Sequence, residues 1–320
     1  TGVPMSERLR PPQWPRREVL EDRLVPAAAG VALAGLAGCG GGRELSADKR
    51  VGAPPLDLVV VRNGEPEVLV RQAMEAMGGM QRFVARGDRV VLKPNIGFNR
   101  VPEQGANTNP EVVRALAVEI LNAGARTVKI FDHSLYEARH CYARSGIAKA
   151  VQDLGVELEF VDERKFVDME LGGEWLKRWP IYREVLEADK VINVPIAKQH
   201  SASRLSLGFK NLMGVIGGRR EAFHQNIHQA LADLGGFFRP TLTILDAYRI
   251  LVRNGPQGGS LSDAVLTRTL AAGVDMVAVD TFGCTLFDIE PAQMGFIVEA
   301  SRRGIGRMDL AGLKTRTVEL

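Results

Sequence analysis

Residues 189–218 read DKVINVPIAKQHSASRLSLGFKNLMGVIGG. The expected fold follows from the change, within this stretch, from an apolar β-branched run to a segment that mixes charged and apolar residues. Its first six residues form a short β-branched run, which predicts a buried strand over residues 189–194. The part that follows, residues 197–218, surrounds four polar side chains with leucines, Phe209 and glycines: Lys198, His200, Lys210 and Asn211. Charged groups beside buried apolar ones need partners or a ligand. We therefore expect residues 197–218 to form the cationic wall of a cleft beyond the carboxyl end of this strand.

The rest of the chain alternates short β-branched runs with amphipathic helices, which indicates an α/β fold. Further strands are expected over residues 56–62, 89–93, 127–131, 156–161, 242–245 and 265–270. Helices are expected over residues 66–77, 146–154, 220–234, 276–286 and 291–303, and from Pro110 onward. The order predicts a mostly parallel sheet with helices on both faces, and residues 56–188 and 189–320 are candidate lobes around the cleft.

Composition excludes several classes of protein. The 320 residues are 45% hydrophobic and 25% charged, which is enough for a large core, and the formal net charge of +3 is too small for the basic face of a nucleic-acid binder. The cysteines Cys39, Cys141 and Cys284 form no C-x-x-C pair. This spacing argues against a zinc ribbon, a dithiol redox motif or an iron–sulfur cluster held by this chain alone.

The first forty residues have the charged-then-apolar order of an export signal. RREVL at residues 16–20 resembles a twin-arginine signal, and LAGC at residues 36–39 resembles a bacterial lipoprotein box. The apolar run between them is too short to be read as a membrane span. We predict an export signal over residues 1–38 and a lipid on Cys39 that anchors the protein at the periplasmic or other extracytoplasmic face of a bacterial membrane. The alternative is a buried Ala/Gly-rich helix with a chance cysteine.

Residues 39–55 contain GGGR and GAPP, a composition typical of a flexible tether. The folded body is therefore expected over residues 56–320.

Polar side chains follow the carboxyl ends of several predicted strands, where open α/β sheets bind ligands. Lys93 ends one strand and is able to meet an anion, or to act as a base if burial lowers its pKa; an exposed strand-end lysine is the alternative. Thr108 or Asn109 is expected to cap the helix that begins at Pro110. The candidate catalytic residues are Lys93, Asp132, His200 and Lys210. The candidate ligand- or cofactor-binding residues are Asn95, Thr108, Asn109, Lys198, Asn211 and Asp246.

Histidine spacing raises the question of a metal. His224 and His228 are four residues apart, which places two imidazoles on one face of the helix expected over residues 220–234. The intervening residues lack the glutamate of H-E-x-x-H, so a third ligand must come from elsewhere. The candidate ligands of a divalent metal are His133, His200, His224 and His228. Two histidines on a solvated helix face are the alternative.

Several separated motifs carry a resemblance to a known family. They are VVLKPN at 90–95, NTNPEVVRAL at 107–116, ADKVINVPIAKQH at 188–200, LGFKNLMG at 207–214, LTILDA at 242–247, GPQGG at 255–259 and DMVAVDTFG at 275–283. Over about residues 57 to 290 the chain resembles the domain-of-unknown-function 362 family. Many relatives are fused to ferredoxin-like iron–sulfur modules, whose cysteine clusters are missing here. The resemblance therefore implies a separate partner for any redox role.

Two functions are compatible with these features. The first is an exported, lipid-anchored enzyme that binds a small anionic or phosphate-bearing ligand, with a divalent metal as a candidate cofactor, for redox or isomerisation chemistry. The second is a non-catalytic lipoprotein, or an assembly factor, that carries a ligand or metal in the cell envelope. The second function keeps the cleft but needs no positioned base.

The twin-arginine assignment is testable by replacing Arg16 and Arg17 together with lysine. We expect the double variant to accumulate in the cytoplasm of a native-like bacterial host while the parent protein is exported, because twin-arginine signals are read through that arginine pair. Cell fractionation followed by immunoblotting measures the distribution. Normal export of the double variant refutes the assignment.

Overall fold

The computed structural model describes residues 56–320, which belong to one compact unit, whereas the predicted export signal, Cys39 and the tether lie outside the described residues. The strands are β1 (Leu58–Arg62), β2 (Arg89–Pro94), β3 (Thr127–Ile130), β4 (Glu157–Leu158), β5 (Phe166–Glu170), β6 (Arg178–Tyr182), β7 (Lys190–Val194), β8 (Ile196–His200), β9 (Arg204–Ser206), β10 (Leu242–Leu251), β11 (Ala264–Gly273) and β12 (Thr315–Glu319). The α-helices are α1 (Pro66–Ala76), α2 (Pro110–Asn122), α3 (Ala138–Arg144), α4 (Ile147–Val151), α5 (Arg183–Glu187), α6 (Gly208–Asn211), α7 (Ile227–Phe238), α8 (Met276–Thr285) and α9 (Gly295–Arg302). Short 3₁₀ helices include η5 (Leu212–Val215) and η6 (Arg220–Gln225).

Ten of these strands form one mixed sheet in the order β12–β1–β11–β10–β7–β2–β3–β4, with β8 joined to β10 and β9 joined to β8. The run from β10 through β7, β2 and β3 to β4 is parallel, and β11 is antiparallel to both its neighbours. In β7 the last four residues are buried, as expected for a central parallel strand covered on both faces. The prediction of a mostly parallel α/β sheet is confirmed.

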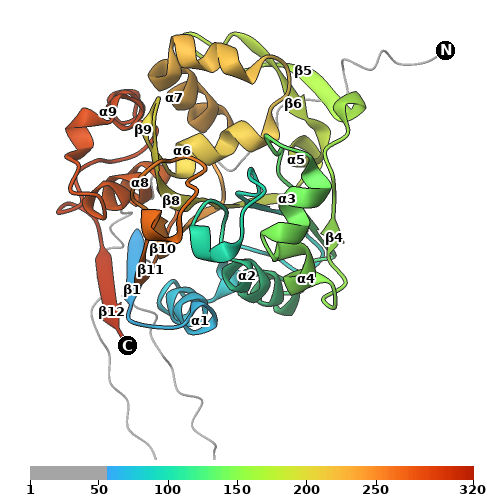
Figure 1. The fold of residues 1–320 in the computed structure, drawn as a ribbon, viewed down its shortest axis with the longest axis vertical. Coiled ribbons are helices and arrows are strands. Elements are labelled where there is room, and N and C mark those ends of the chain that lie inside the picture. Colours follow the sequence, from blue (N-terminus) through green and yellow to red (C-terminus); the bar gives the residue numbers. More distant parts are fainter. Residues whose placement is uncertain (1–55) are drawn as a thin grey trace, which may run out of the picture. The chain divides into compact units, whose positions relative to one another are not determined.

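Helices cover both faces of this sheet (Figure 1). Helix α1 packs on β1 and β11 and helix α2 on β2 and β3, whereas α6 packs on β7 and α8 on β10 and β11. Two of these helices begin with a side-chain cap. Asn109, as predicted, accepts a hydrogen bond from the Glu111 N–H at α2, and Asp275 accepts from Val277 and Ala278 at α8. Within the described residues no helix is long and apolar enough to cross a membrane.

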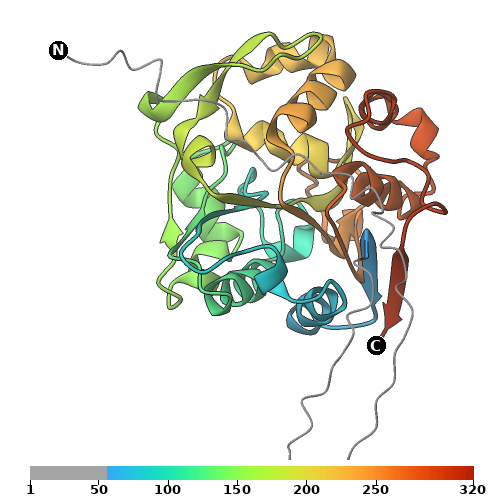
Figure 2. The ribbon, with the colours of Figure 1, turned by 180° about the vertical axis from the view of Figure 1, so that it is seen from behind.

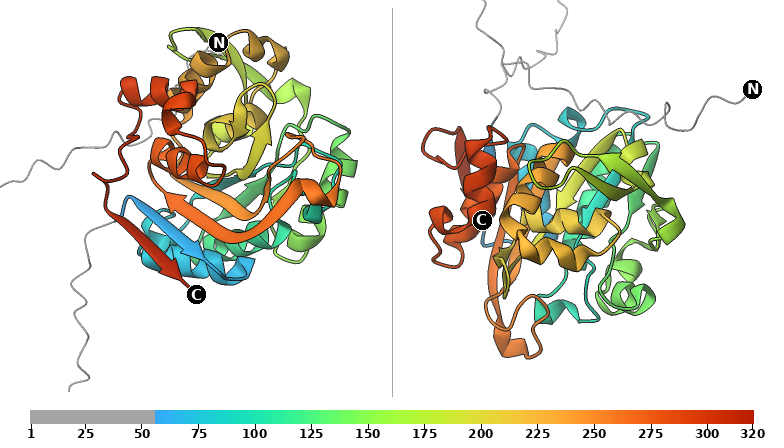
Figure 3. Two further views of the ribbon diagram at one scale, coloured as in Figure 1. Left: turned by 60° about the vertical axis from the view of Figure 1, so that its left-hand side comes forward. Right: turned by 90° about the horizontal axis from the view of Figure 1, so that it is seen from above.

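The division into lobes at residues 188 and 189 does not separate two bodies within residues 56–320. Strands β7, β10 and β11 from the second half lie between β1 and β2 from the first half, so a single sheet runs through both. Strand β1 lies beside β12 near the carboxyl end of the chain (Figure 2). Strands β10 and β11 form a long hairpin that extends beyond the rest of the sheet (Figure 3).

The helix expected over residues 220–234 is wrong as a single element. Residue Asn226 has φ −148° and ψ 56°, which is outside the helical region, and it separates η6 from α7. As a result His224 and His228 belong to different helices, and the spacing argument for a shared helix face fails. Between β4 and β7 the chain forms the antiparallel β5–β6 hairpin, which is followed by α5.

Candidate functional site

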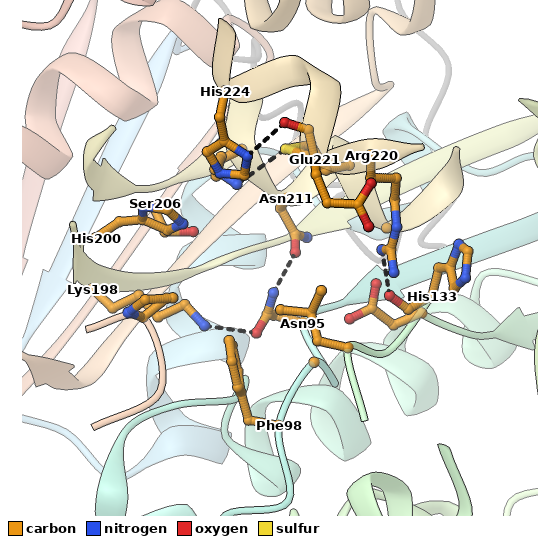
Figure 4. Close-up of a pocket in the computed structure, with 17 residues that line it drawn as sticks. Asn95, Phe98, His133, Lys198, His200, Ser206, Asn211, Arg220, Glu221 and His224 are labelled. Atoms are coloured by element: carbon orange, nitrogen blue, oxygen red, sulfur yellow. Dashed lines mark hydrogen bonds between the residues drawn. The ribbon is translucent and has the colours of Figure 1, made fainter. Parts of the chain in front are cut away.

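A cavity of about 170 Å³ opens where the carboxyl ends of β2 and β3 meet the segment from β8 to η6 (Figure 4). Asp132, His200 and Lys210, three of the four predicted catalytic residues, line this cavity. Among the predicted ligand-binding residues, Asn95, Lys198 and Asn211 also line it. The parallel strand ends explain this convergence, because consecutive βα loops emerge at the same sheet edge.

Lys93, the remaining predicted catalytic residue, lies behind the cavity wall and is fully buried. Its Nζ is 2.9 Å from Oδ1 of Asp132 and donates to the Pro94 carbonyl oxygen at 2.7 Å and to Asn211 Oδ1 at 3.3 Å. Burial lowers the pKa of Lys93, and the Asp132 carboxylate opposes this effect. Three acceptors match the three N–H bonds of an ammonium group, so Lys93 is held within the wall and its amine does not reach the cavity.

Asp132 is held from several directions at the end of β3. Its Oδ2 accepts the Ile96 N–H at 2.6 Å, and its own backbone N–H donates to the Tyr142 hydroxyl at 2.8 Å. The opposite wall approaches closely at Gly214, where an added Cβ would lie 1.8 Å from Asp132 Oδ1 and 2.7 Å from Lys93 Nζ. A glycine is therefore required where η5 passes over the ion pair.

A chain of hydrogen-bonded amides crosses the cavity floor. Lys198 Nζ donates to Asn95 Oδ1 at 2.9 Å, and Asn95 Nδ2 donates to Asn211 Oδ1 at 3.2 Å. Asn211 Nδ2 then donates to Asn193 Oδ1 at 2.9 Å. A lysine ammonium group only donates hydrogen bonds, so the oxygen of the Asn95 amide must face Lys198. This fixes the orientation of Asn95 and, through it, of the other two amides.

Lys198 is almost fully buried at the cavity edge. Besides Asn95, its Nζ donates to the Ala106 carbonyl oxygen at 2.6 Å and lies 4.5 Å from the centre of the Phe98 ring. Burial lowers the pKa of Lys198 to about 7, and the charges of Lys210 and Lys93 add to this effect. The amine therefore exchanges its proton near neutral pH.

Lys210, on α6, has the least satisfied amine of the three lysines. Its Nζ donates a hydrogen bond to the thioether sulfur of Met213 at 3.0 Å, and a thioether is a weak acceptor. Burial and, to a smaller extent, the positive charge of Arg220 together lower the pKa of Lys210 to about 8. No carboxylate among the described residues forms an ion pair with Lys210.

Arg220 is a cavity residue that sequence reasoning missed. Its guanidinium donates to the carbonyl oxygens of His133 at 2.7 Å and Ser134 at 3.3 Å, which leaves other N–H groups facing the cavity. Burial lowers its pKa, yet an arginine stays charged in the neutral range. The available signal was the arginine pair Arg219-Arg220 directly after the glycines that end residues 197–218.

His200 is neutral, and the protein sets its tautomer. Its Nδ1 accepts the backbone N–H groups of Ala202 at 3.0 Å and Ser203 at 3.3 Å, so the proton resides on Nε2. Burial, together with the positive charges of Lys210 and Lys198, lowers the pKa of His200 to about 3. The ring stacks on His224, 6.2 Å between ring centres. His200 is therefore suited to donate a hydrogen bond rather than to accept a proton.

Three of the four histidines predicted as metal ligands, His133, His200 and His224, line the cavity, but they do not form a cluster that could hold a metal ion. His133 uses Nδ1 on the Ile216 carbonyl oxygen at 2.9 Å and places Nε2 3.3 Å from a Glu163 carboxylate oxygen. His228 stacks on Phe296 and does not line the cavity. His200 and His224 stack on each other, and nowhere in residues 56–320 do three histidine, cysteine, aspartate or glutamate residues gather as a metal would need.

Three predicted ligand-binding residues hold the loop after β2 in place. Thr108 Oγ1 accepts the Asn95 N–H and donates to the Val194 carbonyl oxygen, both at 2.8 Å. Asn109 caps α2, and its backbone N–H donates to Asp246 Oδ2 at 2.7 Å. None of Thr108, Asn109 and Asp246 lines the cavity. Their side-chain oxygens accept backbone N–H groups, so these residues hold the loop backbone, and Thr108 positions Asn95 directly.

Asp280 supports the same wall from behind. Its carboxylate accepts the N–H groups of Gly208 at 2.7 Å and Phe209 at 3.1 Å, where α6 begins. Burial raises the pKa of Asp280 to about 7. This carboxylate therefore positions the helix that carries Lys210 and is not a counter-ion within the cavity.

Fold and site together define an α/β protein with a cationic cavity at the carboxyl ends of its parallel strands. The chain belongs to the family described as "Domain of unknown function (DUF362)", whose model matches residues 90–285. The resemblance seen in the sequence motifs is thereby confirmed.

Two individual proteins are similar to this chain. The thylakoid-associated protein sll1697 of Synechocystis sp. is 29% identical over 245 residues, which cover 74% of each protein. The solved structure of a lactate racemase apoprotein from Thermoanaerobacterium thermosaccharolyticum matches with a TM-score of 0.48 and 13% sequence identity, over 71% of this chain and 56% of the racemase chain.

The close approach at Gly214 predicts a large effect of a single methyl group. Gly214→Ala places Cβ against Asp132 and Lys93, which cannot move without breaking a buried ion pair, and we expect a loss of about 3 kcal/mol in the free energy of unfolding. Urea denaturation measures this change. Gly259→Ala is the matched control, because a Cβ there meets nothing within 4 Å, and its expected change is below about 0.5 kcal/mol. Equal unfolding free energies for the two variants would contradict the packing argument.

Proposed function

We propose that this protein is an enzyme that binds a small organic anion in the cavity and moves a proton on it. The observation that carries the proposal is the charge of the cavity wall. Lys93 neutralises Asp132, so the three lining cations Lys198, Lys210 and Arg220 face one remaining lining carboxylate, Glu221. Uncompensated cations in a partly buried site favour an anionic ligand.

The apolar part of the lining favours an organic anion over a bare inorganic one. Phe98, Leu135, Met213 and Pro256 line the cavity beside the cations. An apolar cavity of about 150 Å³ accommodates benzene, so about 170 Å³ suits a ligand of similar size. A carboxylate or phosphate on a small apolar body combines both requirements.

The lysine amines support catalysis rather than binding alone. A group that exchanges protons in a reaction works best when its pKa lies near the working pH, and the pKa values of Lys198 and Lys210 are about 7 and about 8. Isomerisation needs a proton to be removed and returned, which an amine that titrates near neutral pH is able to do. A non-catalytic carrier would need the cations but no amines that titrate near neutrality.

Benzoate is a suitable probe because it carries one carboxylate on an apolar ring. We expect its affinity, measured by isothermal titration calorimetry, to fall roughly tenfold as the pH rises through the range from about 7 to about 8 and beyond. The sign follows from protonation: the lysines bind an anion as ammonium groups, present below these pKa values and lost above them. Benzoate itself stays ionised over this range.

Benzamide provides the matched control, because it has nearly the same shape without the charge and should bind much more weakly. Arg220→Gln should weaken benzoate binding about tenfold and retain the pH dependence, since it removes a cation that does not titrate in this range. Equal affinities for benzoate and benzamide, or a benzoate affinity that rises with pH, would refute the anion site.

We also propose that the protein is associated with a membrane. The order of arginine pair, apolar run and LAGC in residues 16–39 supports this location, as does the name of the thylakoid-associated relative. A lipid on Cys39 would attach the body without a membrane-spanning helix.

The anchor is testable through the thiol that would carry it. We expect Cys39→Ser to move the protein from the membrane fraction to the soluble extracytoplasmic fraction, because serine provides no thiol for lipid attachment. Cys141→Ser is a control, since Cys141 is buried in the folded body. Membrane recovery of the Cys39 variant equal to that of the parent would exclude this anchor.

A further inference from the structure

Three lysines meet at this site, and their amines differ in how completely the protein satisfies them. Lys93 has three oxygen acceptors. Lys198 has two oxygen acceptors and the face of Phe98. Lys210 has the sulfur of Met213. Lys210 is therefore the one of the three whose nitrogen has room for a new bond within the cavity.

The surroundings of Lys210 favour an uncharged amine. The cavity wall buries most of the side chain, Arg220 places a second cation nearby, and no carboxylate pairs with the ammonium in the described part of the chain. Desolvation and a neighbouring cation are the two devices that make a lysine nucleophilic towards carbonyl compounds. Its pKa of about 8 leaves a substantial neutral fraction at neutral pH, unlike an ordinary lysine.

The cavity contains hydrogen-bond donors that suit a ligand with both a carbonyl group and a carboxylate. Arg220 uses two N–H groups on backbone carbonyls and has others for a carboxylate, which its planar fork binds well. His200 presents Nε2–H as a donor for a carbonyl oxygen, because its Nδ1 accepts backbone N–H groups. Figure 4 shows His200 and Arg220 on different sides of the cavity.

From this geometry we propose that Lys210 forms an imine with the keto group of a small 2-oxo carboxylate. This inference rests on the proposed anion site and names its ligand class. The neutral Nζ attacks the carbonyl carbon, and the carbonyl π electrons move to oxygen. A proton passes from nitrogen to that oxygen through solvent, and the carbinolamine then loses water. The net change is amine plus ketone to imine plus water, with no oxidation or reduction.

The imine acidifies the carbon next to it, which connects the proposal with proton transfer. When a proton is removed from that carbon, the electron pair left behind moves toward the iminium nitrogen of Lys210. Lys198, whose pKa is about 7, lines the same cavity and is the amine available to take and return this proton. The two lysines thus have separate roles, one covalent and one in proton exchange.

Reductive trapping tests the imine directly. The protein is incubated with pyruvate and sodium cyanoborohydride near neutral pH, and the modified lysine is identified by peptide mass spectrometry. We expect one reduced pyruvate adduct on Lys210, formed at least about tenfold faster than on exposed lysines, because an ordinary lysine amine is almost fully protonated under these conditions. The wild-type mapping does not depend on whether any variant folds.

Lys210→Arg is the matched variant, because it keeps the positive charge and cannot form an imine. We expect it to lose the adduct, and benzoate binding to the parent protein is measured alongside as the separate test of the anion site. Benzoate binding without an adduct on Lys210, or an adduct on Lys198 in its place, overturns the imine and leaves the anion site standing. Absence of both benzoate binding and adduct overturns the two proposals together.

Discussion

The buried ion pair between Lys93 and Asp132 is the interaction on which the site depends. It connects the end of β2 to the end of β3, and its side chains are 0% and 3% exposed. A buried pair is stable only when hydrogen bonds satisfy both partners, and here Asn211, the Pro94 carbonyl and the Ile96 N–H complete the set. The same bonds attach α6 to the sheet edge, so the cavity wall and the sheet are held by one cluster.

Distance from this ion pair decides what each lysine can do. Lys93 lies within the pair and keeps its charge, whereas Lys198 is two amides away, through Asn95 and Asn211. Lys210 lies on the far wall beside Met213 and Arg220. Identical side chains therefore have different protonation behaviour because the number of oxygen acceptors falls from one to the next. Chemistry at this site is a property of the network and not of residue type.

The sequence was sufficient to predict the sheet edge and much of its polar content. Lys198, His200, Lys210 and Asn211 were identified because polar groups within an apolar segment need partners, and that reasoning does not require a structure. It was insufficient to separate lining residues from supporting ones. Thr108, Asn109 and Asp246 are the same residue types that bind ligands, but their oxygens accept backbone N–H groups, which only the folded loop reveals. The break at Asn226 likewise depends on a backbone angle that helical periodicity does not report.

Pairing of the first strand with the last ones has a consequence for synthesis of the protein. Leu58 pairs with Gly273 in β11 and with Thr315 in β12, so β1 has no sheet neighbour until β11 has left the ribosome. The apolar β1, made first, must wait unpaired, and contacts of such large sequence separation form slowly. During translation, β1 therefore exposes unpaired backbone N–H and C=O groups that are able to pair with another chain. Binding of a chaperone in this period would protect the growing chain from aggregation.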